Sequence, residues 1–173
     1  MVSAGVGYRV PGIGKERVIE ILDTVKDPEV PALSVVELGI VRDVEIDGDR
    51  VTVVVTPTYS GCPAMHVIED DMRAALREQG IERVEIRTVY APAWTTDWMS
   101  DAAREKLRAY GIAPPGRADT GGLVTLTRKR AAVACPFCGS ANTTLTTEFS
   151  STACKAMHMC HACHQPFEEF KAI

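Results

Sequence analysis

The sequence lacks a long apolar run, an export signal and an excess of basic charge. No window approaches 18 consecutive apolar residues, and the first thirty residues show no basic start followed by an apolar run and a small-residue cleavage site. We therefore expect a soluble, cytoplasmic chain with no membrane partner. The formal net charge of −4 provides no basic surface for phosphate backbones, so nucleic acid is not an expected partner either.

Two nucleotide-binding motifs are also missing. The chain contains neither G-x-x-x-x-G-K-[ST] nor G-x-G-x-x-G, the glycine patterns that cradle phosphates. The composition is otherwise ordinary, with 46% apolar and 24% charged residues, which excludes wholesale disorder. The length of 173 residues allows one medium domain or two small ones.

Charge and cysteine both divide the chain in two. Residues 1–116 hold 13 Lys and Arg against 19 Asp and Glu, whereas residues 117–173 hold 6 against 4. Cys62 stands alone in the first part, and the other five cysteines fall within the last forty residues. Because no export signal precedes them, we expect reduced thiols, which favours metal binding or thiol chemistry over disulfides.

Hydrophobic periodicity in the first part predicts an α+β fold in the order αββαβα, a small sandwich of helices against a mixed sheet. Apolar positions at helical spacing begin near Lys15, and Asp47-Gly48-Asp49 is a hairpin turn signal. The predicted elements are a helix over 15–27, strands over 35–46 and 50–56, a helix from Pro63 to Gly80, a strand over 83–89 and a helix between Ser100 and Gly111.

Breaker residues and composition suggest four segments along the chain. A glycine-rich start and a proline-containing stretch before the basic 128–130 run separate the predicted elements. The expected segments are a flexible arm over 1–14, the α+β domain over 15–115, a linker over 116–133 and a small β domain over 134–173. The last segment is too short to bury a sufficient core, so it needs a metal, disulfides or a partner.

Two C-x-x-C pairs in the last segment predict that metal. They are separated by 21 residues, and each pair can present two thiolates from one tight turn. With predicted strands over 143–149, 157–159 and 167–170, the pattern is typical of a zinc ribbon holding structural Zn²⁺. The predicted ligands are Cys135, Cys138, Cys160 and Cys163.

A rubredoxin-like iron site uses the same ligands and stays open as an alternative. The second turn has His164 where such a site has a glycine, which favours zinc. Four further donors are surplus to a four-thiolate site and are more typical of surface or packing residues, although one could replace a Cys or hold a second, transient metal: Cys154, His158, His161 and His164.

Cys62 precedes Pro63, which places it at or next to the start of a helix. The positive end of the helix dipole favours a thiolate there, so Cys62 is a candidate nucleophile or soft-metal ligand, or else a small capping residue. Asp27 and Glu29 flank Pro28 and could lie near this cysteine, although two carboxylates beside a proline are more typical of helix-end and turn residues. Trp94 and Trp98 are candidates for partner binding or for plugging the gap between helix and sheet.

The segments 27–31 (DPEVP), 34–41 (SVVELGIV) and 58–65 (TYSGCPAM) resemble the DUF59 (MIP18-like) domain of iron-sulfur cluster assembly factors. With 92–98, 110–115, 151–156 and the ribbon, the chain from residue 15 onward is similar to the PaaD (PaaJ) family, accessory subunits of bacterial phenylacetyl-CoA epoxygenase. The resemblance implies a role in aerobic phenylacetate breakdown. It also maps the single DUF59 cysteine onto Cys62 and the acidic turn onto Asp27 and Glu29. Because Cys154 lies in the shared 151–156 segment, the resemblance also favours a functional role for Cys154.

Three functions follow from this resemblance and the cysteines. In the first, Cys62 transiently holds iron or a cluster for maturation of the epoxygenase system, chiefly its iron-sulfur reductase, and the ribbon docks the client. One cysteine cannot complete a cluster, so a homodimer, a carrier thiol or Cys154 must contribute. In the second, the chain is a structural or regulatory subunit that binds the oxygenase. In the third, an iron-loaded ribbon relays electrons. None of the three makes the chain an enzyme by itself.

Overall fold

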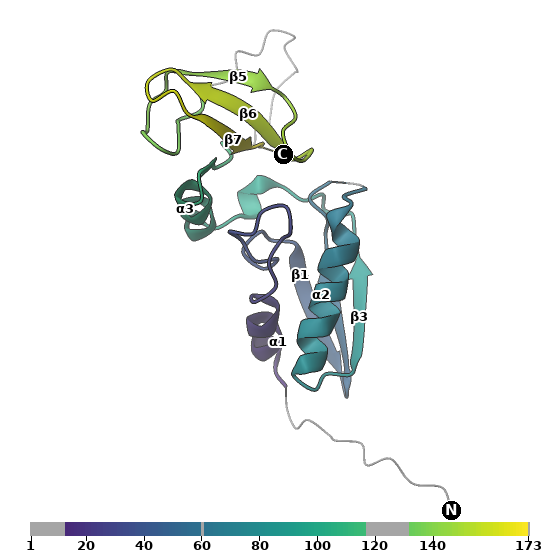
Figure 1. Cartoon of the computed structure of the whole chain (residues 1–173). Coiled ribbons are helices and arrows are strands. Elements are labelled where there is room, and N and C mark those ends of the chain that lie inside the picture. The colour runs from purple at the N-terminus through teal and green to yellow at the C-terminus, as the bar shows by residue number, and fades with distance from the viewer. Residues whose placement is uncertain (1–12, 60, 117–131, 173) are drawn as a thin grey trace, which may run out of the picture.

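The computed structural model describes residues 13–59, 61–116 and 132–172. Most of the expected arm over 1–14 and most of the expected linker over 116–133 lie outside these ranges. The molecule has an α+β body at one end and a β ribbon at the other (Figure 1). Along the described chain the elements of the body follow the predicted order αββαβα, which confirms the fold class.

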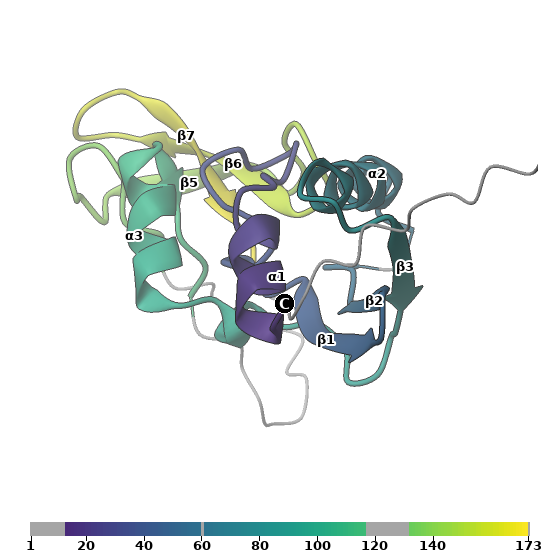
Figure 2. The same cartoon turned by 90° about the horizontal axis from the view of Figure 1, so that it is seen from below.

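The body is built on a mixed three-stranded sheet in the order β1-β2-β3. β1 (Val41–Asp47) and β2 (Arg50–Val55) form the expected antiparallel hairpin, and Gly48 has the positive φ of 61° that their tight turn requires. β3 (Arg83–Thr88) runs parallel to β2, so it needs a crossover, which α2 (Ala64–Glu78) supplies. α1 (Lys15–Leu22) and α2 lie on the same face of the sheet (Figure 2).

Helical spacing explains how α2 covers that sheet. Ile68, Met72 and Leu76 follow one another at intervals of four and are all fully buried. The other half of the helix surface carries ion pairs such as Arg73 with Glu69, 3.1 Å apart. The helix therefore stays amphipathic, and its packing face holds it in place over the strands.

Two predicted boundaries are wrong in this region. The first helix ends at Leu22 instead of Asp27, and the first strand starts at Val41 instead of Val35. The intervening chain turns because Ser34 and Glu37 cap each other: the Ser34 N–H donates to Glu37 Oε2 (3.0 Å), and the Glu37 N–H donates to Ser34 Oγ (3.0 Å). Local side-chain hydrogen bonds thus outweigh the β propensity of this stretch.

The ribbon is a four-stranded sheet in the order β4-β7-β6-β5. Its three long strands are β5 (Thr143–Thr147), β6 (Lys155–Cys160) and β7 (Pro166–Phe170), close to the predicted strands. The fourth, β4 (Ile112–Ala113), follows α3 (Asp101–Ala109), which Ser100 caps as predicted, and it pairs in parallel with β7. The end of the expected first domain therefore lies inside the ribbon sheet.

The ribbon also enters the main hydrophobic core. Phe170, at the end of β7, is only 1% exposed and belongs to the same buried cluster as α1 and α2. Its ring lies 6.1 Å from that of Trp94, which itself is buried and donates from Nε1 to the Leu38 carbonyl (3.0 Å). Trp94 thus packs between the two parts of the molecule and is not accessible to a partner. This corrects its candidacy for partner binding.

Trp98 lies at the edge of this region, in the short 3₁₀ helix Thr96–Trp98. It is partly buried, and the Arg42 guanidinium covers its ring at 3.5 Å from the centroid. Such a contact stabilises an exposed aromatic edge by about 0.5–1 kcal/mol. Trp98 therefore keeps some accessible surface, and its role in partner binding stays a prediction.

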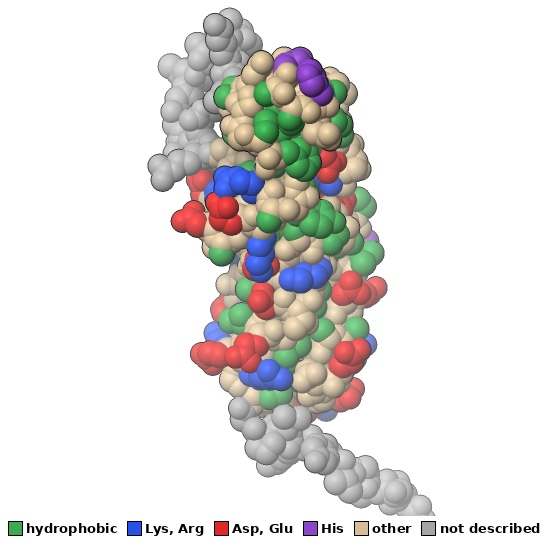
Figure 3. Space-filling model, turned by 60° about the vertical axis from the view of Figure 1, so that its left-hand side comes forward, with side chains coloured by type: hydrophobic (Ala, Val, Ile, Leu, Met, Phe, Trp, Pro, Cys, Tyr) green, Lys and Arg blue, Asp and Glu red, His purple; other side chains and the backbone are tan. Residues whose placement is uncertain are grey.

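Charge is unevenly spread over the surface. On the face shown in Figure 3, acidic and basic side chains gather over the body, while the ribbon end shows mainly hydrophobic and uncharged groups. Exposed aromatics at the ribbon include Phe149 (66% exposed) and Phe137 (57%). No helix in the described part of the chain is long and apolar enough to cross a membrane.

We expect Phe170→Ala to destabilise the whole molecule by about 3–5 kcal/mol, the usual cost of deleting a buried aromatic ring. Because Phe170 fills the core beneath Trp94, urea unfolding followed by tryptophan fluorescence measures the loss. Phe149→Ala, which removes an exposed ring of the same ribbon, is the matched control with a loss of about 1 kcal/mol or less. Equal losses in the two variants would show that the ribbon does not share the main core.

Candidate functional site

The four ribbon cysteines converge on one point. Their Sγ atoms all lie within 4.8 Å of one another, with Cys135 and Cys163 3.7 Å apart and Cys138 and Cys160 3.6 Å apart. None of the six cysteines forms a disulfide. Four sulfurs around a tetrahedral zinc, with Zn–S bonds of about 2.3 Å, stand about 3.8 Å apart. The arrangement therefore fits a closed four-thiolate metal site.

Each C-x-x-C pair sits on a turn whose next residue has a left-handed backbone. Gly139 follows Cys138 with φ 75°, and His164 follows Cys163 with φ 58°. The sequence comparison with a rubredoxin-like site predicts that His164 sets the second turn apart. Its backbone instead adopts the conformation of the glycine, so the two turns have the same shape and this sequence difference does not separate zinc from iron.

Backbone N–H groups point at the sulfurs, as the turn shape predicts. The N–H groups of Cys163 and Ala162 donate to the Cys160 sulfur and lower the pKa of this thiol to about 7. The N–H of Ser140 likewise acts to lower the pKa of Cys138, although burial and the neighbouring Cys160 and Cys135 sulfurs raise that pKa overall. These donors stabilise thiolates, which are the form that binds a metal.

None of the surplus donors joins the four-cysteine set, which is the sole group of its kind in the described ranges. His158 is buried, stacks on Phe167 and pairs with Glu169 (2.7 Å), so it serves packing. His161 is exposed and bonds Thr144 (3.0 Å), and His164 is exposed. The structure thus agrees with the expected packing or surface positions of these histidines, and a second, transient metal at any of them stays a prediction. Cys154 lies elsewhere, beside the body.

A second cluster forms where the ribbon meets the body. Asp27, Glu29, Cys62 and Cys154 line one cavity together with apolar side chains such as Ile68 and Phe170. We call it the acid–thiol cavity. It has room for about 10 Å³, roughly one water molecule. The structure thus brings together Cys62 and the acidic turn, which lie far apart in sequence, and adds Cys154 from the ribbon.

The two acidic residues have different tasks in this cavity. Asp27 is buried, and its Oδ1 accepts from the N–H groups of Glu29 (2.7 Å) and Val30 (2.9 Å). An aspartate side chain stabilises a turn in this way, by accepting from backbone groups two and three residues further on. Asp27 therefore fixes the turn, and the turn aims the Glu29 carboxylate at the cavity, where the Cys154 thiol donates to Glu29 Oε2 at 3.7 Å.

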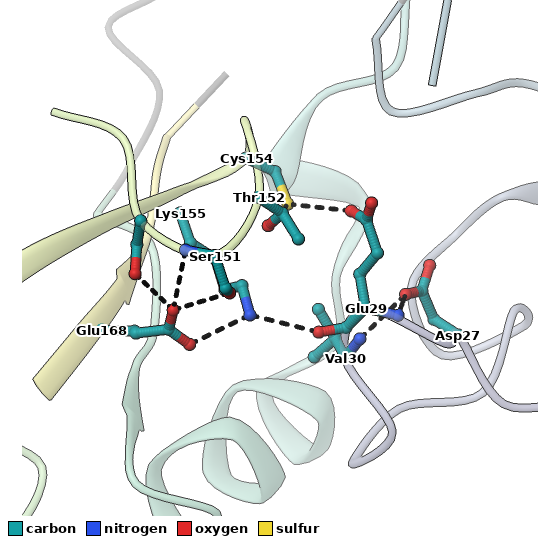
Figure 4. A network of polar contacts seen from close by, with 9 residues as sticks. Asp27, Glu29, Val30, Ser151, Thr152, Cys154, Lys155 and Glu168 are labelled. Atoms are coloured by element: carbon teal, nitrogen blue, oxygen red, sulfur yellow. Dashed lines mark hydrogen bonds and ion pairs between the residues drawn. The ribbon is translucent and has the colours of Figure 1, made fainter. Parts of the chain in front are cut away.

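Lys155 ties this turn to the ribbon, as Figure 4 shows. Its buried Nζ donates to the Glu29 backbone carbonyl (3.2 Å) and pairs with Glu168 (3.0 Å). Glu168 in turn accepts from the hydroxyls of Ser150 and Ser151. The network links β6 and β7 to the acidic turn, and every buried charge in it has a partner.

The two parts of the chain match two known families. Residues 119–171 match the family described as "PaaD zinc beta ribbon domain", and residues 15–89 match "Iron-sulfur cluster assembly protein". A protein of Escherichia coli (strain K12) that is named as a 1,2-phenylacetyl-CoA epoxidase component is 44% identical over 153 residues, which cover 88% of this chain and 90% of that protein. The chain belongs to the PaaD family.

Other relatives of this PaaD-family chain match the body alone. The Fe-S protein maturation auxiliary factor YitW of Bacillus subtilis (strain 168) is 37% identical over 92 residues, 52% of this chain and 89% of that protein. Among solved structures, a DUF59 domain from Bacillus anthracis has 30% sequence identity and a TM-score of 0.51, and it covers 54% of this chain and 90% of its own. The body is therefore a DUF59 fold to which a ribbon has been joined.

Burial governs the protonation of the cavity in this PaaD-family chain. Desolvation raises the pKa of Cys62, against the opposing hydrogen bonds from the Ala64 N–H and the Tyr59 hydroxyl. The helix start thus favours the thiolate as expected, but burial and the nearby carboxylates outweigh it. Cys62 is therefore held mainly as the thiol in this structure.

The pKa values of the other three acidic groups that line the cavity are also raised. Burial raises the pKa of Asp27, and burial together with the Asp27 charge raises that of Glu29. Burial raises the pKa of Cys154 to about 11, although the Thr152 hydroxyl opposes it. Burial thus raises the pKa of four acidic groups that share one small space, a pattern that is typical of functional sites.

Sequence reasoning missed three residues that lie outside the cavity lining but interact with its groups or with one another around it. Tyr59 lies in the 58–65 segment but had no assigned role, and Lys155 and Glu168 were not singled out. The available signal for Lys155 was its position next to Cys154. In the structure Lys155 is 5% exposed, and a lysine buried to this extent needs a carboxylate partner. The partner, Glu168, lies on the next strand and could be found only once β6 and β7 were paired.

We expect Glu168→Gln to lower the free energy of unfolding by about 1–3 kcal/mol at neutral pH, because it leaves Lys155 without its buried counter-charge. Burial alone would raise the pKa of Glu168, but hydrogen bonds from Ser150, Lys155 and Ser151 lower it to about 2 from 4.5. Its stabilisation is therefore present above pH 4.5 and is lost as the pH falls toward 2.

Urea unfolding of the native chain and the variant across this pH range measures the effect. The difference between the two stays constant from pH 7 down to about pH 5 and shrinks below it. Any metal that acid releases from the ribbon is lost from both proteins, so its effect cancels in the difference between their free energies of unfolding. If the difference in free energy of unfolding stayed the same down to about pH 2.5, the ionised Glu168 carboxylate would not be the group that stabilises Lys155.

Proposed function

We propose that this chain is a non-catalytic accessory protein that holds iron or an iron-sulfur cluster in transit to the phenylacetyl-CoA epoxygenase system. The observation that carries the proposal is the acid–thiol cavity, in which Cys62 and Glu29 face one small space. Thiolates bind iron and exchange it by ligand substitution, and a carboxylate adds a harder ligand that suits iron outside a complete cluster. The cargo is thus a substrate that the protein passes on.

The relatives support this assignment. The E. coli relative is named as part of an epoxidase, and the B. subtilis relative as a maturation auxiliary factor. The iron-sulfur reductase of the epoxygenase system is the client that the cargo chemistry favours. The exposed aromatics Phe137 and Phe149 provide apolar surface at the ribbon through which a client could dock.

The ion at the four cysteines is zinc in this proposal, with a purely structural task. Four thiolates leave a tetrahedral ion with no open position, so it does no hydrolytic or transfer chemistry. Cys135, Cys138, Cys160 and Cys163 hold it and thereby fold the ribbon. Zinc contributes on the order of 10 kcal/mol to such small domains.

Removing that metal should disturb the body as well as the ribbon, because Phe170 belongs to the main core. We expect a strong chelator to shift the emission of the buried Trp94 to longer wavelength and to lower the unfolding temperature. Zinc restores both, and the metal content measured beforehand is one zinc per chain without visible absorbance. A red protein with one ferric ion at this site would favour electron relay instead.

Replacement of Cys62 tests the transfer function. We expect the reductase from cells carrying Cys62→Ser to lose most of its iron and sulfide, since the cargo has lost its sulfur ligand. The control is His66→Ala, an exposed donor one turn further along α2, which should leave the clusters intact. Iron and sulfide per purified reductase are the readout. A full cluster complement with Cys62→Ser would leave a structural or regulatory subunit as the function.

A further inference from the structure

Cys154 is a thiol that the zinc site does not use. It lies directly before β6, is 4% exposed, and falls outside the four-cysteine group. Although the ribbon carries it, it packs in the main core of the body. Its Sγ lies 3.7 Å from Glu29 Oε2 and 3.1 Å from Thr152 Oγ1, on the wall of the acid–thiol cavity.

Packing alone does not account for this residue. An alanine or valine would fill the same position without placing a polar atom against a carboxylate, and the partial burial of Glu29 beside this thiol carries a desolvation cost. That cost is offset where the two groups bind a common cation. Soft-metal and cluster sites in proteins use several sulfurs, and the body offers Cys62 alone.

Lys155 places Cys154 and Glu29 relative to each other. It is the next residue along the chain, and its Nζ holds the Glu29 carbonyl from the ribbon side (Figure 4). The contact fixes the position of the acidic turn against β6. Lys155 carries a positive charge and cannot itself bind a metal, so it acts as a positioning residue.

Metal binding requires side-chain rotation in this cavity. Glu29, Cys62 and Cys154 do not all bring their ligand atoms within 4.8 Å of one another in the described ranges, since the ribbon quartet alone meets that limit there. Cys62 and Glu29 are only partly buried, whereas Cys154 is enclosed. Cys154 is thus the fixed ligand toward which the other two move.

We propose that Cys154 is the second sulfur ligand of the iron cargo, so that the body and the ribbon build the transfer site together, Cys62 and Glu29 from one and Cys154 from the other. This inference rests on the proposed function and deepens it. Fe²⁺ binds with the loss of one proton from each of the two thiols, and no electron is transferred. The ribbon is then a ligand-donating arm in addition to a docking module.

The experiment is an anaerobic Fe²⁺ titration of the zinc-loaded full chain, with X-ray absorption at the iron edge to count sulfur neighbours. The native chain should show two sulfurs, and Cys154→Ser or Cys62→Ser one. We expect each cysteine variant to weaken Fe²⁺ binding about 100-fold or more, and Lys155→Met to weaken it about 10- to 100-fold, as loss of a supporting contact does. His66→Ala should retain native affinity and two sulfurs.

The controls separate folding from ligation. Zinc per chain and the buried-tryptophan emission must match the native protein, and Cys154→Ala, which suits the apolar surroundings, replaces Cys154→Ser if the serine disturbs folding. Native affinity and two sulfurs in a folded Cys154 variant would overturn the inference and leave the proposed function standing. No Fe²⁺ binding by the native chain, or four sulfurs around iron with zinc displaced, would overturn both.

Discussion

The packing of the ribbon into the core of the body is the contact on which the other features of this molecule depend. β7 ends in Phe170, which completes the apolar cluster of α1 and α2, and β4 carries the end of the body into the ribbon sheet. The same approach brings Cys154 and Lys155 to the acidic turn. If the two parts only shared a tether, the acid–thiol cavity would lose one wall.

In the proposed function, zinc and the iron cargo bind sulfur at two sites that are coupled through this contact. At the quartet, backbone N–H donors favour the thiolate of Cys160, and the four sulfurs lie close enough to surround one ion in a closed site. At the acid–thiol cavity, burial favours the protonated thiols, so that cargo must displace protons to bind. A site of this second kind releases cargo more readily, which suits a protein that passes iron on.

The sequence predicted the elements of the body and the four-cysteine group of the ribbon because their signals are local. Helical spacing in α2, the Asp47-Gly48-Asp49 turn and the C-x-x-C spacing each lie within a short stretch of chain. The Ser34–Glu37 turn was missed because reciprocal side-chain hydrogen bonds overrode β propensity. Asp27, Glu29 and Cys62 were grouped only through the family resemblance. Because Cys62 is distant in sequence from the other two, local patterns do not predict the cavity that they share.

The meeting of Cys154 with Glu29 could not be read from the sequence, because they are 125 residues apart and belong to different parts of the molecule. The most direct measurement is a crystal structure of the zinc-loaded protein soaked anaerobically with Fe²⁺, with anomalous data at both metal edges. The account predicts zinc at the cysteine quartet and a separate iron peak bounded by Cys62, Glu29 and Cys154. Iron only at the quartet, or an empty cavity at saturating Fe²⁺, would contradict it.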